Sequence, residues 1–196
     1  MVDPETRIDA KRYIDIRLAR HAVQKKDEKR ISELIRISEF DHIHKAWLMT
    51  QAAQLLTKTD REKALSLTEL AIGEARRISP SDPDSPRAFL CAVNAVFLLD
   101  RSAVWETMNE AIKNANSAEN FTGEDTQLQF RLVLKSGLTY VSSESVPDFT
   151  LQNIFKGLAE FDYEKAVQLA GGLKRDAPRS AATLAIAGAV LETKEK

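Results

Sequence analysis

The stretch Asp60-Arg-Glu-Lys-Ala64, followed by Leu67 and Ala71, carries the pattern that decides the fold. Its apolar residues recur three or four positions apart, which is the spacing of one face of an amphipathic helix. The aspartate stands just ahead of that face, where its side chain can accept hydrogen bonds from the free backbone N–H groups of the first helical turn. The stretch therefore predicts a capped helix with one buried side.

The same pattern occurs at three other places in the chain. Asp27, Asp100 and Asp162 each stand four residues before a small or β-branched residue, and an amphipathic segment follows each of them. Asp27 and Asp60 are 33 residues apart, and Asp60 and Asp100 are 40 residues apart. These spacings lie in the range of stacked two-helix repeats.

A second pattern precedes the first and makes the repeating unit a helix pair. A cation stands eight residues before an alanine in Lys11 with Ala19, Lys45 with Ala53, Arg87 with Ala95, and Arg179 with Ala187. We expect nine helices, over about residues 4–24, 27–38, 41–57, 60–78, 85–99, 100–117, 150–160, 162–174 and 178–193. From Asp100 to Asp162 the spacing grows to 62 residues, which indicates an insertion.

The packing positions resemble those of tetratricopeptide repeats. The residues that carry the resemblance are Ala52, Leu55, Ala64, Ala71, Ala92, Ala95, Val104 and Ala111. The resemblance covers about 130 residues. Where the family has a glycine between the two helices of a repeat, this chain has Thr59 or no equivalent residue, and only Pro178 matches the proline that closes the family's repeat. The resemblance implies a right-handed helical solenoid that holds partner proteins on a concave face. The alternative is a HEAT-type repeat or a helical repeat particular to this protein. The expected fold is all-α, a two-helix-repeat solenoid forming a single helical-repeat domain over residues 1–196.

Residues 118–149 form the insertion and do not follow the helical pattern. From Gln127 to Leu134 apolar and polar residues alternate, a period of two that is typical of a strand. The chain resumes after Gly137 with further apolar residues, so we expect an inserted β-hairpin. We favour a hairpin that covers one flank of the helices. The alternative is a recognition element, for which the candidate binding residues are Phe130, Arg131, Lys135 and Tyr140.

The last helix, Ser180 to Leu191, is apolar on nearly every side. It matches the first helix of a repeat, and no second helix follows it before Lys196. We therefore expect either a piece of a longer solenoid or a chain that self-associates at this end. The residues expected to make that contact are Leu184, Ile186, Val190 and Leu191. The alternative is an alanine-rich helix that packs tightly and leaves one small face exposed.

Composition excludes several classes of protein. Of the 196 residues, 43% are hydrophobic and 29% are charged, with a net charge of -1, which is the balance of a globular protein and argues against a general nucleic-acid binder. The basic excess within residues 1–36 is interpreted as a solvated surface. No signal peptide is apparent, and the longest apolar stretch, Ala88 to Leu99, is too short to span a bilayer. The compartment is unknown, with the cytoplasm as the default unless the chain is a fragment of an exported protein.

No residue pattern points to catalysis, a metal or a cofactor. His42 and His44 are two positions apart, which places them on different sides of a helix, and no cysteine lies in reach. Cys91 stands in the most apolar segment and is expected to be a small buried residue, and Trp47 and Trp105 are expected in the core. We expect a non-enzymatic scaffold that binds a protein or peptide. The alternatives are a purely structural segment of a longer solenoid, a binder of nucleic-acid backbone, and an enzyme with a dispersed site.

Overall fold

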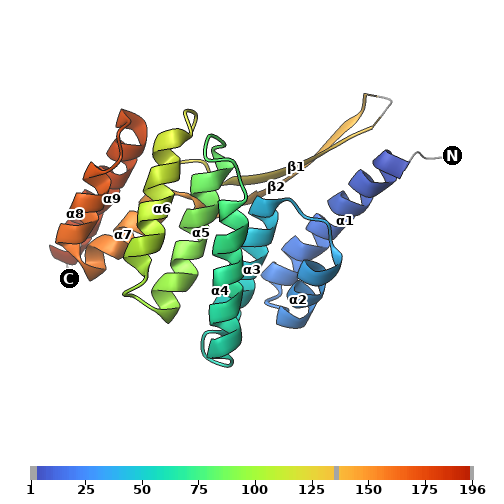
Figure 1. The fold of residues 1–196 in the computed structure, drawn as a ribbon, viewed down its shortest axis with the longest axis horizontal. Helices are drawn as coiled ribbons and strands as arrows, with labels where there is room; N and C mark the ends of the chain where they lie inside the picture. The colour runs from blue at the N-terminus through green and yellow to red at the C-terminus, as the bar shows by residue number, and fades with distance from the viewer. Residues whose placement is uncertain (1–3, 135–136, 195–196) are drawn as a thin grey trace.

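The computed structural model describes residues 4–134 and 137–194. Within these residues the chain is mostly helical, with nine α-helices and a two-stranded antiparallel sheet. The helices are α1 (Pro4–Gln24), α2 (Glu28–Ile37), α3 (His42–Leu56), α4 (Arg61–Arg76), α5 (Asp84–Leu99), α6 (Val104–Ser117), α7 (Leu151–Phe161), α8 (Tyr163–Gly171) and α9 (Asp176–Lys194). They lie side by side in a row from α1 to α9 (Figure 1). The predicted helical class and the inserted hairpin are confirmed.

Aspartate caps begin three of the helices as predicted. In α2, α4 and α8 the Oδ1 atoms of Asp27, Asp60 and Asp162 accept the backbone N–H three residues further on, at 3.0 to 3.1 Å. Each carboxylate satisfies a backbone group that the helix itself leaves without a partner, and its negative charge suits the positive end of the helix dipole.

Asp100 departs from this pattern and corrects one predicted boundary. Its Oδ1 accepts the Ser102 hydroxyl at 2.6 Å, the Ser102 N–H at 2.9 Å and the Ala103 N–H at 3.4 Å. These hydrogen bonds, chiefly the one from the Ser102 hydroxyl, lower the pKa of the Asp100 carboxyl. They close a turn over residues 100–103, so α6 begins at Val104 rather than at residue 100.

Small residues let neighbouring helices approach closely. Among the positions that carry the resemblance to tetratricopeptide repeats, the buried ones are Ala52, Ala64, Ala71, Ala92, Ala95, Val104 and Ala111. Leu55 is partly buried against the same core. Alanine adds no side chain beyond Cβ, so backbones separated by it can pack at the short end of the usual interhelical distance. Trp47 and Cys91 are buried in this core as predicted, whereas Trp105 is only partly buried.

The inserted hairpin consists of β1 (Gln127–Val133) and β2 (Thr139–Ser145). Gln127 pairs with Ser145 and Val133 with Thr139 in an antiparallel register. Every second residue of β1 is buried, which confirms the alternation predicted from the sequence. The hairpin packs against α1, at the opposite end of the row from α9 (Figure 1). That contact stabilises two strands that would be marginal alone.

A glycine fixes the path by which the inserted segment returns to the helices. Gly123 has a φ of +85°, and a Cβ at this position would lie 2.4 Å from the Leu151 Cδ1 atom. The Gly123 carbonyl accepts the Leu151 N–H at 2.9 Å, at the start of α7. Only glycine combines this left-handed backbone with so close an approach. The short 3-10 helix η1 (Pro147–Phe149) then buries Phe149 and leads into α7.

Candidate functional site

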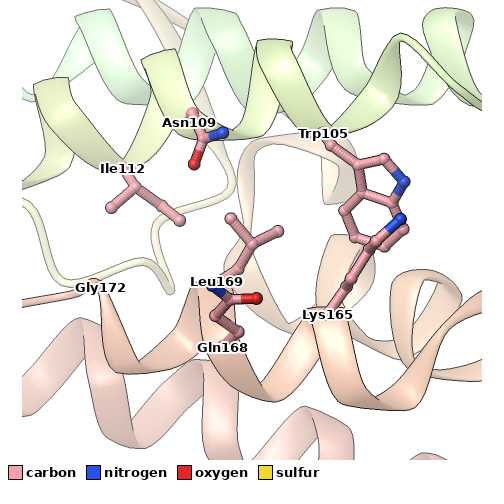
Figure 2. A pocket seen from close by; sticks show the side chains of 7 residues that line it. All are labelled: Trp105, Asn109, Ile112, Lys165, Gln168, Leu169 and Gly172. Atoms are coloured by element: carbon pink, nitrogen blue, oxygen red, sulfur yellow. The ribbon is translucent and has the colours of Figure 1, made fainter.

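A cleft of about 340 Å³ between α6 and α8 is the candidate binding site (Figure 2). One wall comes from α6, the other from α8, and the end of α8 completes the floor. The lining residues are Trp105, Asn109, Ile112, Lys165, Gln168, Leu169 and Gly172.

An aromatic cluster closes one end of the cleft. The Trp105 ring stacks on Phe161, with 5.9 Å between ring centroids and 13° between planes. The Lys165 ammonium nitrogen lies 5.1 Å from the Trp105 ring centroid, and Phe97 meets Phe161 edge-on at 5.5 Å. Cation–π and aromatic contacts of this kind hold the rings in fixed positions. They keep Trp105 at the surface of the cleft, which corrects its predicted place in the core.

Polar contacts to the connection between α8 and α9 close the other end. The Asn116 amide donates to the Gly172 carbonyl at 2.9 Å, and the Asn116 Oδ1 atom accepts the Lys174 N–H at 2.8 Å. The α6 residues that line the cleft run from Trp105 to Ile112, seven positions or about 10 Å of helix. An extended chain advances about 3.3 Å per residue, so the cleft spans about three residues of a peptide.

The middle of the cleft combines an apolar floor with two uncommitted amides. Ile112 and Leu169 are buried or partly buried and form the floor. Asn109 and Gln168 stand on opposite walls, are exposed, and make no side-chain hydrogen bond within the described ranges. A side-chain amide both donates and accepts hydrogen bonds, so it matches the alternating N–H and C=O groups of a peptide backbone.

The neighbouring cleft between α4 and α6, of about 290 Å³, is occupied by an ion pair instead. The Arg76 guanidinium donates to both carboxylate oxygens of Glu110, at 2.9 and 2.5 Å. This bidentate hydrogen bonding raises the pKa of Arg76 and lowers the pKa of Glu110. Glu69 and Glu106 line the same cleft and make it acidic. Of these two clefts, the one between α6 and α8 is therefore the better suited to a peptide.

The candidate residues predicted on the hairpin do not share one face. Phe130 is 8% exposed and packs against Tyr13, with 6.2 Å between ring centroids. Tyr140 lies on the same side of the sheet and also contacts Tyr13, at 6.4 Å, although 45% of its surface is exposed. Arg131 is exposed and pairs with Val141 on the outer side. Lys135 lies outside the described residues.

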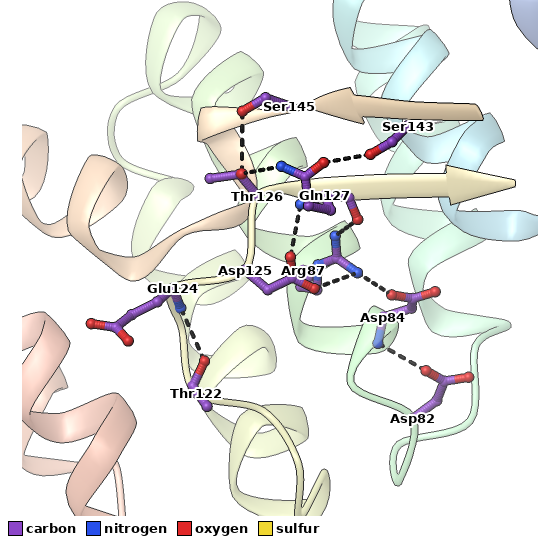
Figure 3. A network of polar contacts seen from close by, with 10 residues as sticks. All are labelled: Asp82, Asp84, Arg87, Thr122, Glu124, Asp125, Thr126, Gln127, Ser143 and Ser145. Carbon is purple, nitrogen blue, oxygen red and sulfur yellow. Dashed lines mark hydrogen bonds and ion pairs between the residues drawn. The ribbon is translucent and has the colours of Figure 1, made fainter. Parts of the chain in front are cut away.

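A buried arginine anchors the hairpin to α5 (Figure 3). The Arg87 Nη1 atom lies 2.5 Å from Asp84 and 3.6 Å from Asp125, and Nη2 donates to the Gln127 carbonyl. The guanidinium also lies 4.7 Å from the centroid of the Phe149 ring. Burial raises the pKa of Asp84, while Arg87 opposes that change. A buried charge is costly unless it keeps its hydrogen-bond and ion-pair partners. Because one of these partners is the carbonyl of Gln127, the first residue of β1, the contact fixes where the strand begins.

A second anchor joins the hairpin to α1. The Arg20 Nε atom donates to the Glu144 carboxylate at 2.5 Å, and Nη1 donates to the Ser142 hydroxyl at 2.6 Å. Glu144 and Ser142 belong to the helix-facing side of β2. Both anchors use long-range contacts that the sequence pattern does not reveal.

The residues predicted for self-association are divided between two faces of α9. Leu184 and Leu191 are 71% and 64% exposed. Ile186 is buried and Val190 is partly buried. An exposed apolar stripe therefore remains on α9, and Leu184 and Leu191 are its large residues.

Other side chains that could take part in catalysis or bind a metal are paired or buried within the fold. The His42 Nδ1 atom lies 2.6 Å from Glu74, which also accepts a hydrogen bond from Arg77 at 2.8 Å. Cys91 is fully buried, and burial raises the pKa of its thiol. No cluster of His, Cys, Asp and Glu within the described part of the chain could hold a metal ion. None of the helices in residues 4–134 and 137–194 combines the length and apolar character needed to cross a bilayer.

Comparisons with protein-family models, with curated proteins and with solved structures give no match for this chain. The sequence did not single out Asn109, Lys165 or Gln168 as binding residues. Lys165 lies within the fourth aspartate-led segment, so the repeat pattern placed it near the start of a helix. Nothing in that pattern indicated that α6 and α8 would leave a cleft between them.

Proposed function

We propose that this protein is a protein- or peptide-binding scaffold, a two-helix-repeat solenoid of tetratricopeptide type that holds an extended peptide in the cleft between α6 and α8. The observation that carries the proposal is the pair of uncommitted amides, Asn109 and Gln168, facing each other over an apolar floor.

The repeat part of the proposal is supported by equivalent contacts in successive helix pairs. The aspartate caps of α2, α4 and α8 have the same geometry. The alanines that follow the cations of α1, α3 and α5 by eight residues, Ala19, Ala53 and Ala95, are all buried. Repeats of this kind stack into extended surfaces that suit elongated partners.

The chemistry of the cleft favours a particular kind of peptide. Asn109 and Gln168 match backbone amides, and the exposed part of Trp105 offers an apolar surface to one side chain. The Lys165 ammonium stands beside Trp105 and 3.7 Å from the Asp162 carboxylate, and its remaining N–H donors favour an acidic residue next to that apolar one. The expected ligand is a segment with about three residues in the cleft, among them an apolar residue adjoining Asp or Glu.

A selection from a random displayed-peptide library on the purified protein tests the proposal. We expect a shared motif of an apolar residue beside an acidic one. The affinity of a synthetic peptide is then measured by fluorescence anisotropy for the wild type and for Asn109→Ala with Gln168→Ala. Loss of two backbone hydrogen bonds should weaken binding about tenfold or more.

A matched control carries the same two substitutions away from the cleft, at Gln24 and Asn120, which are also exposed. Its affinity should equal that of the wild type. An Arg131→Ala variant tests the hairpin as the alternative recognition element. The proposed site is contradicted if substitution of Gln24 and Asn120 weakens peptide binding as much as substitution of Asn109 and Gln168. It is also contradicted if the selected peptides lose affinity for Arg131→Ala and keep it for Asn109→Ala with Gln168→Ala.

The exposed apolar stripe of α9 favours a second candidate function. In this alternative the protein is a structural segment on which further helix pairs stack. When α9 is aligned with α5 on Arg179 and Arg87, Leu184 and Leu191 correspond to Ala92 and Leu99. The α5 residues are buried, whereas the α9 leucines are exposed. In α5 these positions are covered within a helix that packs against α3, α4 and α6, so a helix pair of the same kind suits the α9 stripe.

The occupant that we propose for this stripe is α1 of a second copy. The outer side of α1 exposes Ile14 and Leu18, so an end-to-end contact joins two apolar helix faces. Sedimentation velocity over a wide concentration range should show wild-type chains associating, and Leu184→Lys with Leu191→Lys should remain monomeric. Leu70→Lys, at another exposed leucine, is the control. A wild type that stays monomeric at every concentration overturns end-to-end association.

A further inference from the structure

A third hollow, of about 380 Å³, lies on different elements from the peptide cleft. Its walls come from the start of α3, the connection between α4 and α5, and the strand β1. Its polar lining residues are Asp41, His42, His44, Arg77, Ser79, Asp82, Asp84 and Gln129, of which His42 is paired with Glu74 at 2.6 Å. This volume suits a small organic molecule or one long side chain.

His44 gives this hollow an unusual polar group. Its side chain is 3% exposed, and neither ring nitrogen has a hydrogen-bond partner among the described residues. The nearest carboxylate oxygen, Asp41 Oδ2, is 4.0 Å from Nδ1, beyond hydrogen-bond distance. Phe130 meets the imidazole edge-on, with 6.3 Å between ring centroids. Buried polar atoms in folded proteins are nearly always hydrogen-bonded, so this ring is suited to a partner from outside the chain.

The ionisation state of His44 determines which partner fits. Burial, the main cause, lowers the pKa of His44 to about 4, with Arg87 acting in the same direction and Asp41 opposing it. The ring is therefore neutral near pH 7 and has one nitrogen that accepts a hydrogen bond. It can receive an N–H from a ligand.

Around the hollow, some carboxylates have no cationic partner among the residues that the structure describes. Arg77 donates to Glu74 at 2.8 Å, and Asp84 is paired with Arg87 at 2.5 Å. Asp82 accepts the Asp84 backbone N–H at 2.9 Å, but within the described ranges no Lys or Arg pairs with Asp82. Asp41 likewise pairs with no Lys or Arg in the described ranges, and the His44 ring, 4.0 Å away, is neutral.

We propose that this hollow binds a small organic cation with N–H donors, an alkylammonium or alkylguanidinium group, which donates one hydrogen bond to His44 and balances the charges of Asp41 and Asp82. The same chemistry is offered by a free amine and by a lysine or arginine side chain of a peptide. The inference does not rest on the peptide cleft, because no residue lines both sites.

Calorimetry with agmatine as the probe tests the proposal, together with the ring-nitrogen NMR signals of His44. Agmatine should bind and move the His44 signals, while butanamide, a neutral molecule with N–H donors, should do neither. Asp82→Asn keeps an oxygen for the Asp84 N–H and removes only the charge, so it should weaken agmatine binding about tenfold. Glu119→Gln, at an exposed carboxylate elsewhere, should leave the affinity unchanged.

Two further arms complete the test. His44→Phe removes the acceptor and should weaken binding to a similar extent. Acetyl-arginine methylamide represents a peptide side chain, and tighter binding of this compound than of agmatine assigns the cation to a peptide. The proposal is overturned if neither cation binds the folded wild type, or if Asp82→Asn and His44→Phe both retain wild-type affinity.

Discussion

Acidification should destabilise the fold through His44. The unfolded chain takes up a proton on this side chain near the ordinary pKa of 6.5, whereas in the folded chain burial lowers the pKa to about 4. The unfolded state therefore binds more protons between these values, and stability falls as the pH drops through them. At about pH 4.5 the loss relative to pH 7 is about 2.5 kcal/mol.

Urea denaturation followed by tryptophan fluorescence measures this loss. The wild type is compared with His44→Phe at pH 7 and at about pH 4.5, so that the effect of other titrating groups, including Asp84 and Asp148 with their raised pKa values, is shared by both proteins. The midpoint difference between the two proteins should change by about 1 M urea, given a slope of about 2 to 3 kcal/mol per M. A change of less than about a fifth of this, or a His44 titration by NMR near pH 6.5, refutes the reasoning.

Three buried residues and one helix cap should each have a measurable effect on stability or reactivity. Phe130→Ala should lower the unfolding free energy by about 3 to 5 kcal/mol, because it leaves a cavity between the hairpin and the helices. Arg131→Ala, on the outer side of the sheet, should change it by less than about 0.5 kcal/mol, and denaturant titration of both variants measures the difference. Arg87→Met should lower stability by about 3 kcal/mol, because it leaves Asp84 without its cation, as thermal unfolding would record. Cys91 should react with Ellman's reagent only when the chain unfolds. Asp60→Ala should cost about 1 kcal/mol through the lost cap of α4, measured by chemical denaturation, while a neutral result would contradict a role for the cap.

The sequence was a good guide wherever local rules decide the structure. Asp60 and its equivalents predicted helix starts because a carboxylate at that position satisfies backbone amides nearby in sequence. The alternation through Leu128 and Leu132 predicted β1 because one face of a half-buried strand must be apolar. The boundary at Asp100 was wrong because a hydrogen bond from Ser102 favours a turn over the first helical residues.

The candidate sites could not be predicted in the same way. Trp105 looks like a core residue in sequence, but its place depends on the distance between α6 and α8, which the periodicity of either helix does not specify. Arg87 is a charge in an apolar helix, and its burial depends on partners 38 or more positions further along the chain, Asp125 and Gln127. Phe130 from the inserted hairpin lies edge-on against His44, so part of what surrounds this side chain comes from a residue 86 positions further along the chain.

The contact between Arg20 and Glu144 has a consequence for folding cooperativity. Repeat arrays hold together through neighbouring units, so their ends normally open first and independently. Here a hydrogen bond joins residues 124 positions apart and ties the first helix to a segment that follows the sixth. The row of helices from α1 to α5 is thereby closed into a ring, because the hairpin is held to α1 through Arg20 and to α5 through Arg87. We therefore expect α1 to open only when the hairpin detaches. In native-state hydrogen exchange, the amides of α1 and of the two strands should therefore be released together, as one unit.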